Sequence, residues 1–264
     1  MNKTGIILVN LNTLSHTRNV IADLRRQNTG CDLTIIDQAS EEPGTQEFLK
    51  GLKWNKGKLK VVFNRINEPL NHLWNKFAAE AQNEYLCFLN SDVRIGSTFV
   101  KDSEDVFEKE GSVAVTVHST NHPVYLAQHS HTVVNYIVPT DQHLRAKKIK
   151  QGWDFTMRKD DWIPIPEKLR LFYGDDFIFM KMLEKNRNVA YILSSPIVHF
   201  QGVSQRPWNG KPFNNKMPPR NDNFRDDTKA WASTGWNHDH NPRPEYTRIK
   251  PTRDIVERYG NGIF

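Results

Sequence analysis

Residues 5–40 read GIILVNLNTLSHTRNVIADLRRQNTGCDLTIIDQAS, and this stretch decides the fold. It contains two short apolar runs, residues 6–10 and 32–37, and the segment between them carries apolar side chains at helical spacing. Short apolar runs of this length are typical of strands buried on both faces. A strand, a helix and a second strand in this order predict a βαβ unit with parallel strands.

The same alternation continues beyond this unit. We expect helices from a cap at Thr13 or Ser15 to about residue 27, over 47–52 and over 69–81, and strands over 60–63 and 85–89. Further on, the pattern predicts strands over 113–117, 154–157, 189–193 and 197–200, and a helix over 177–183. The sequence therefore predicts an α/β fold with a mostly parallel central sheet flanked by helices.

The chain length fits one large domain, or one domain with a substantial appendage. The chain has 264 residues, of which 38% are hydrophobic, and a formal net charge of +6. Its two cysteines, Cys31 and Cys87, lie in or beside apolar runs, so we expect buried thiols in a reducing compartment. No apolar stretch approaches the ~20 residues that a membrane span needs, and the N-terminal run is too short for a signal peptide. A cytoplasmic protein is the expectation.

Polar side chains follow the predicted strands. Asn10, Asp37 and Asp92 each end an apolar run, and the carboxyl ends of parallel strands are where such sheets bind ligands. A carboxylate fixed there can bind a divalent metal, although Asn-Ser-Asp alone also suits a simple turn. Asp175 and Asp176 open a helix, where one could cap it and the other could act as a general base. His199 ends a further run and suits either a core position or a metal ligand.

The order of these features resembles glycosyltransferase family 2, the inverting transferases with the GT-A (Rossmann-like) fold. The matching segments are ILVN (7–10), IIDQAS (35–40), the Asn-rich NEPLNHLWN (67–75), LNSDV (89–93), GDD (174–176) and PIVH (196–199) followed by GVS (202–204). The resemblance covers about residues 5–204. It implies a GT-A domain over 1–204, with a nucleotide-binding half (1–110) and an acceptor and catalytic half (111–204), followed by an irregular extension over 205–264.

The resemblance also implies roles for individual residues. It places the donor nucleotide against Asn10, Asn12, Asp37, Asn67, Asn75, Asn90 and Ser91, with Asp37 on the base. It assigns Mn²⁺ or Mg²⁺ to Asp92 and His199, and the catalytic base to the acidic pair, with Asp176 favoured over Asp175. The implied reaction moves a sugar, most simply from a UDP-sugar, to an acceptor hydroxyl with inversion at the anomeric carbon.

Three departures from the family pattern bear on these roles. Pro69 replaces a customary Gly, Asn90 replaces the first acid of the Asp-x-Asp motif, and Asp175 replaces the usual Glu. The substitution at Asn90 removes one carboxylate from the metal site. Residues 205–208 do not fit the Gln-x-x-Arg-Trp spacing of processive members, which argues against a polysaccharide synthase.

The last 64 residues suggest candidate acceptors. From residue 201 onward there are eleven Lys and Arg against seven Asp and Glu, interleaved with aromatics as Arg206/Trp208, Lys211/Phe213, Phe224/Arg225, Lys229/Trp231 and Tyr246/Arg248. Cations beside stacking rings suit DNA; a strap that packs its tryptophans on the core is the alternative. The acceptor is therefore a glycan, a lipid-linked sugar, or hydroxymethylated DNA bases, as for some bacteriophage glycosyltransferases. A non-catalytic nucleic-acid-binding protein on the same scaffold is a further alternative.

Overall fold

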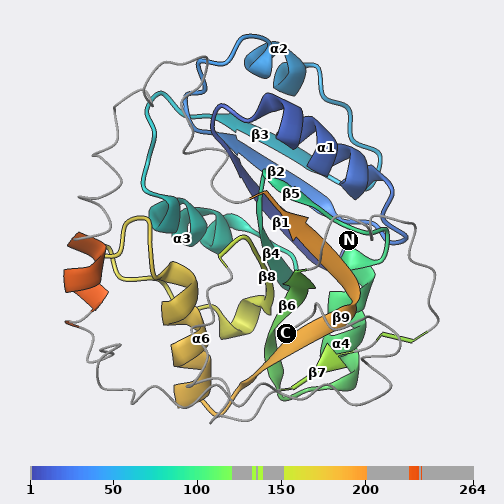
Figure 1. Cartoon of the computed structure of the whole chain (residues 1–264), viewed down its shortest axis with the longest axis vertical. Coiled ribbons are helices and arrows are strands. Elements are labelled where there is room, and N and C mark those ends of the chain that lie inside the picture. Colours follow the sequence, from blue (N-terminus) through green and yellow to red (C-terminus); the bar gives the residue numbers. More distant parts are fainter. Residues whose placement is uncertain are drawn as a thin grey trace.

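The computed structural model describes residues 2–120, 133–134, 136–138, 152–200, 226–231 and 233. A nine-stranded sheet runs through the molecule in the order β3-β2-β1-β4-β8-β6-β9-β5, with β7 paired to β9 (Figure 1). Its strands are β1 (Thr4–Asn10), β2 (Asp32–Asp37), β3 (Leu59–Phe63), β4 (Tyr85–Asn90), β5 (Val93–Arg94), β6 (Val113–Thr120), β7 (Tyr136–Ile137), β8 (Asp154–Arg158) and β9 (Asn188–His199).

The first four strands are all parallel, as the βαβ pattern predicts, and β6 also runs parallel to β9. Strand β8 is antiparallel to both β4 and β6, and β5 and β7 are antiparallel to β9. The predicted α/β class with a mostly parallel sheet is confirmed, with one antiparallel strand inserted at its centre.

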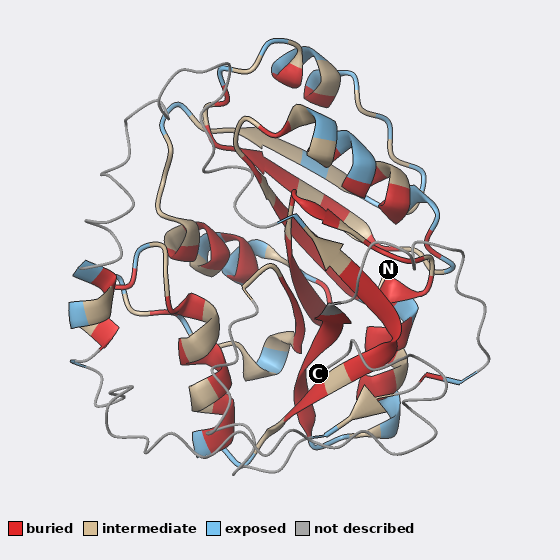
Figure 2. Ribbon diagram, in the orientation of Figure 1, coloured by how far each residue is buried: buried red, intermediate tan, exposed pale blue. Residues whose placement is uncertain are grey.

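Helices cover both faces of the sheet. They are α1 (Leu14–Arg25), α2 (Thr45–Lys50), α3 (Leu70–Glu80), α4 (Phe99–Lys109) and α6 (Gly174–Glu184). Side chains of β1 alternate between two cores: Ile6 and Leu8 pack with α1, α2 and α4, whereas Ile7 packs with α3 and α6. Figure 2 shows the sheet buried between these layers and the outer faces of α1 and α2 exposed. Each fully buried aliphatic side chain contributes about 1.5–3 kcal/mol through removal of apolar surface from water.

Two local expectations need correction. The hydroxyl of Thr13 does not cap α1; the Glu42 carboxylate accepts the Leu14 N–H instead, at 2.7 Å. The two strands expected over 189–193 and 197–200 are one strand, β9, whose pairing with β6 is irregular between Ile192 and Ile197. Pro196 lies in that interval and lacks the N–H that a regular ladder needs, which explains the irregularity.

Helix α4 was missed by the pattern analysis. Its buried residues Phe99, Val100, Ser103, Val106 and Phe107 recur at three- and four-residue spacing, so its periodicity was available in the sequence. None of the helices in the described part of the chain is long and apolar enough to cross a bilayer. Both cysteines are buried and unpaired, as expected, and burial raises the pKa of Cys31 to about 12.

Candidate active site

The carboxyl ends of β1 and β2 form a buried polar cluster. Asn10 pairs with Asp37 in the ladder, and its Nδ2 donates to Asp37 Oδ1 at 2.7 Å. The Ser40 hydroxyl donates to the same carboxylate oxygen at 2.6 Å, and Asp37 is fully buried. The Asp37 carboxylate therefore fixes the two strand ends relative to one another.

The cluster extends to the end of β4 through hydroxyl groups. Thr13 Oγ1 donates to Asn10 Oδ1 at 2.9 Å and lies 2.8 Å from Ser91 Oγ. Because Ser91 separates Asn90 from Asp92, this chain of contacts holds the predicted metal motif against the first strand. The Asn90 N–H donates to the Trp153 carbonyl at 2.9 Å, which fixes the motif from the other side.

Asn12 joins the loops that follow β1 and β2. Its backbone adopts a left-handed conformation with φ of 51°, which Asn tolerates better than most residues. The Asn12 side-chain oxygen accepts the N–H groups of Glu41 and Glu42 at 2.7 and 3.1 Å. Its amide oxygen thus shapes the rim of the predicted nucleotide site.

The two remaining asparagines differ in what their amides contact. Asn75 donates to the carbonyl of Ile165 and accepts its N–H, both at 2.8 Å, so its side chain bridges α3 to a distant loop. Asn67 Nδ2, by contrast, is buried and has no hydrogen-bond partner among the described residues. A buried donor left unsatisfied is costly, so Asn67 suits contact with a ligand acceptor and Asn75 suits a structural role.

The pairing of β5 with β9 brings Asp92 and His199 together. Val93 pairs with His199, and the Phe200 N–H donates to the Asp92 carbonyl at 2.9 Å. As a result His199 Nε2 lies 3.5 Å from Asp92 Oδ1. The His199 ring stacks on Trp153 with centroids 4.6 Å apart, and its Nδ1 is buried without a partner in the described part of the chain.

The chemistry of these two side chains fits a divalent cation. A carboxylate oxygen and an imidazole nitrogen are suitable ligands for Mn²⁺. The described residues contain no group of three or more His, Cys, Asp or Glu arranged to hold a metal. Asp92 and His199 alone would leave most coordination positions open to a ligand or to water.

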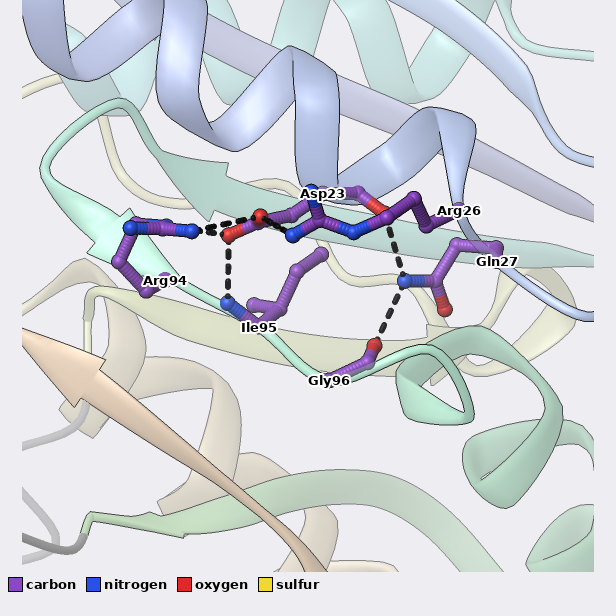
Figure 3. A network of polar contacts seen from close by, with 6 residues as sticks. All are labelled: Asp23, Arg26, Gln27, Arg94, Ile95 and Gly96. Atoms are coloured by element: carbon purple, nitrogen blue, oxygen red, sulfur yellow. Dashed lines mark hydrogen bonds and ion pairs between the residues drawn. The ribbon is translucent and has the colours of Figure 1, made fainter. Parts of the chain in front are cut away.

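A buried ion pair anchors β5 (Figure 3). The carboxylate of Asp23 in α1 accepts Arg94 Nε at 2.6 Å, Arg94 Nη2 at 3.0 Å and the Ile95 N–H at 3.1 Å, and also contacts Arg26. The hydrogen bond that Arg94 donates to Asp23 raises the pKa of Arg94, so this cation stays charged. The contact fixes the strand that places Asp92 opposite His199.

The acidic pair lies in the first turn of α6. Tyr173 precedes it in a left-handed conformation with φ of 61°, and Asp175 and Asp176 are both partly exposed. A Cβ on Gly174 would lie 2.2 Å from Asn71 Oδ1, so only glycine allows this approach of α3 to the turn. The acidic turn is therefore tightly packed on its inner side.

Residues 152 and 153 link the acidic pair to the Asp92–His199 pair. A Cβ on Gly152 would lie 3.2 Å from the carboxylate of Asp175, whereas the next residue, Trp153, carries the ring that stacks on His199. The structure thus brings the two predicted chemical groups to adjoining residues immediately before β8, although Asp92 and Asp175 lie 83 positions apart in the sequence. Gly152 and Trp153 were absent from the sequence prediction, and neither carries a recognisable motif.

The family assignment follows from the chain's sequence. The family model of glycosyl transferase family 2 matches residues 5–161, and the chain belongs to that family. Comparison with curated protein sequences gives no match.

Solved structures agree on the fold. The chain is similar to S. aureus TarS 1–349, with 19% identity and a TM-score of 0.55 over 73% of this chain and 58% of that one. It is also similar to TarS 1–349 in complex with UDP-GlcNAc (16% identity, TM-score 0.60, 90% and 69% covered). GalNAc-T7 with UDP, GalNAc and Mn²⁺ gives 16% identity and a TM-score of 0.59 over 89% of this chain and 50% of that one. The predicted GT-A-like fold is confirmed, and this chain spans 58% of the first relative's length.

Proposed function

We propose that this chain is a metal-dependent, inverting glycosyltransferase that moves a sugar from a nucleotide-sugar donor to an acceptor hydroxyl. The observation that carries the proposal is the junction at Gly152 and Trp153, two adjacent residues of which the first lies beside Asp175 and the second stacks on His199. A transferase needs both a site for the donor diphosphate and a base for the acceptor, close to one another. The family membership supports the same reaction class.

The donor would lie across the carboxyl ends of β1, β2 and β4. Asn10, Asn12, Asp37 and Ser91 shape this site through the hydrogen bonds described above, and Asn67 supplies an amide donor without a partner among the residues that the structure describes. We propose a UDP-sugar, because the structurally similar TarS and GalNAc-T7 were solved with UDP-GlcNAc and with UDP and GalNAc.

Asp92 and His199 would hold a divalent cation, Mn²⁺ or Mg²⁺, beside the diphosphate. Such a cation offsets negative charge on a leaving diphosphate. The neighbouring Asn90 contributes no charge, so Asp92 is the carboxylate of this motif that the proposal uses. Trp153 keeps the His199 ring in place by stacking.

Asp176 would accept the proton of the acceptor hydroxyl. The acceptor oxygen then forms a bond to the anomeric carbon from the face opposite the leaving group. The bond from that carbon to the phosphate oxygen breaks, and its electron pair leaves with the nucleoside diphosphate. Asp175, whose carboxylate adjoins Gly152, would orient the turn.

The acceptor is proposed to be a glycan or a lipid-linked sugar. DNA would require exposed cation and aromatic pairs in the C-terminal segment. In the described residues of that segment, Trp231 is 4% exposed and belongs to the core beside α6, while Lys229 is exposed. The Lys229/Trp231 pair is therefore unsuited to base stacking, in line with a strap that packs on the core.

A donor panel tests the proposal. UDP-, GDP- and dTDP-sugars are each incubated with Mn²⁺, with and without hydroxymethylated DNA, and nucleoside diphosphate release is measured. Release from a UDP-sugar that EDTA abolishes and DNA does not stimulate is the expected result. DNA stimulation would redirect the acceptor assignment to modified bases. No release with any donor would overturn the enzyme proposal in favour of a non-catalytic scaffold.

A further inference from the structure

The loop that leads into the acidic pair is held from its α3 side by Asn71. Asn71 is fully buried, and its Nδ2 donates to the carbonyls of Leu169 and Phe172 at 3.1 and 3.2 Å. The Asn71 N–H donates to the Arg170 carbonyl at 3.1 Å. These contacts constrain the loop's carbonyl groups and leave its N–H groups to another partner.

That partner comes from a segment more than fifty residues further along the chain. The carboxylate of Asp227 accepts three consecutive backbone N–H groups, from Arg170 at 2.9 Å and from Leu171 and Phe172 at 2.8 Å each. Asp227 is 0% exposed, so these bonds form away from water, where charge-assisted hydrogen bonds are strong. Figure 1 shows the short helix of residues 226–231, in orange-red, beside the loop before α6.

The same short helix also holds Tyr173, the residue that immediately precedes Gly174 and the acids. The Tyr173 hydroxyl lies 3.0 Å from Thr228 Oγ1, and its ring stacks on Trp231 with centroids 5.5 Å apart and planes 12° apart. Tyr173 has φ of 61°, a left-handed conformation that a bulky residue keeps only where its surroundings enforce it. Residues 226–231 supply those surroundings.

We infer that Asp227 is a positioning residue for the transfer reaction, and that residues 226–231 belong functionally to the catalytic half of the enzyme. This inference rests on the proposed function. It means that residues outside the segment 5–161, which the family model matches, also help to position the active site. The acids follow directly after the braced loop, so a shift of the loop moves the proposed base relative to the acceptor. A misplacement of about 1 Å can cost a hundredfold in rate.

The variant Asp227→Asn tests the inference, because it keeps the shape of the side chain and removes one acceptor oxygen together with the charge. We expect kcat to fall about 10- to 100-fold while the dissociation constant for UDP with Mn²⁺ stays within about twofold of wild type. The acid limb of the kcat–pH profile shifts, whereas a mere loss of folded protein lowers kcat equally at every pH. Amide exchange at residues 170–172 becomes faster.

Lys229→Ala is the matched control, since Lys229 is exposed on the same short helix, and it leaves kcat and amide exchange unchanged. Thr228→Val is the milder variant, to be used if Asp227→Asn does not fold; it lowers kcat in the same direction by a smaller factor. Wild-type kcat and pH profile in a folded Asp227→Asn protein would overturn the inference. Absence of turnover in the wild type with every donor would instead overturn the proposed function. Amide exchange at residues 170–172 would still show whether Asp227 holds the loop, because that measurement does not depend on turnover.

Discussion

The two halves of the proposed site are built differently. On the donor side, side chains from neighbouring parallel strands bond to one another, as Asn10 does with Asp37 and Thr13 does with Ser91. On the acid side, distant side chains hold the backbone of a loop: Asn71 reaches residues 169–172 from earlier in the chain and Asp227 from later in it. The difference teaches that the donor site follows from the regular sheet, whereas the base is positioned by long-range contacts.

The largest expected effect is a loss of turnover, without a loss of UDP binding, when the acid half is changed. Asp176→Asn keeps the shape of the side chain but removes the proposed base. We expect turnover to fall about 10²–10⁴-fold, the usual contribution of a positioned base, while UDP binding is retained. Asp175→Asn serves as the comparison and should lose less. Wild-type turnover in Asp176→Asn would remove that residue from the role and point to Asp175.

The next prediction concerns how much the ion pair that anchors β5 on the donor side stabilises the fold. Asp23→Ala leaves Arg94 partly buried and without its carboxylate partner, and it frees the Ile95 N–H. We expect the free energy of unfolding to fall by about 3 kcal/mol, measured by urea denaturation. Arg26→Ala removes only the exposed partner of the same carboxylate and should cost about 1 kcal/mol or less. Equal losses of unfolding free energy in the two variants would show that the buried Asp23–Arg94 contact stabilises the fold no more than the exposed Asp23–Arg26 contact.

A glycine substitution tests the junction between the halves. Gly152→Ala places a Cβ 3.2 Å from the Asp175 carboxylate, so the Asp175 side chain must move by a few tenths of an ångström. We expect kcat to fall about tenfold or more with UDP affinity unchanged. Gly111→Ala is the matched control, because nothing lies within 4 Å of its added Cβ. A Gly152→Ala enzyme as active as Gly111→Ala would argue against this junction.

The smallest effect is expected in the chemical labelling of the two cysteines, which lie in the core between the sheet and α1. Burial raises the pKa of both thiols, that of Cys31 to about 12, so at pH 8 neither forms the reactive thiolate. A chromogenic disulfide reagent should label no thiol in the native protein and both thiols in denaturant. Rapid labelling of native protein would show that the donor half opens more readily than its packing suggests.

Much of the donor half could be predicted from sequence. Strands β1 to β4 and helices α1 to α3 follow from apolar periodicity, and the strand-end residues Asn10, Asp37 and Asp92 follow from the parallel topology. The meeting of Asp92 and His199 was implied only by family resemblance, because it depends on the antiparallel pairing of the two-residue strand β5 with β9. No periodicity can be detected in two residues.

The acid half was less predictable. The Gly174-Asp175-Asp176 turn is visible in the sequence, but its supports are not, since Asp227 lies more than fifty residues away in a segment whose basic and aromatic residues suggested either DNA binding or a strap on the core. Gly152 carries no motif, and its role depends on the tertiary approach of α6 to β8. Such contacts are set by packing between distant segments, which local patterns do not encode.

The most direct test of the account is the Mn²⁺ dependence of UDP binding to wild type and to His199→Ala, measured by calorimetry. Asp92 and His199 are held together by β5 and β9, so the account predicts that Mn²⁺ strengthens UDP binding to the wild type and that this gain is largely lost in His199→Ala. Equal Mn²⁺ dependence in the two proteins, or none in the wild type, would contradict a metal-assisted donor site at this edge of the sheet.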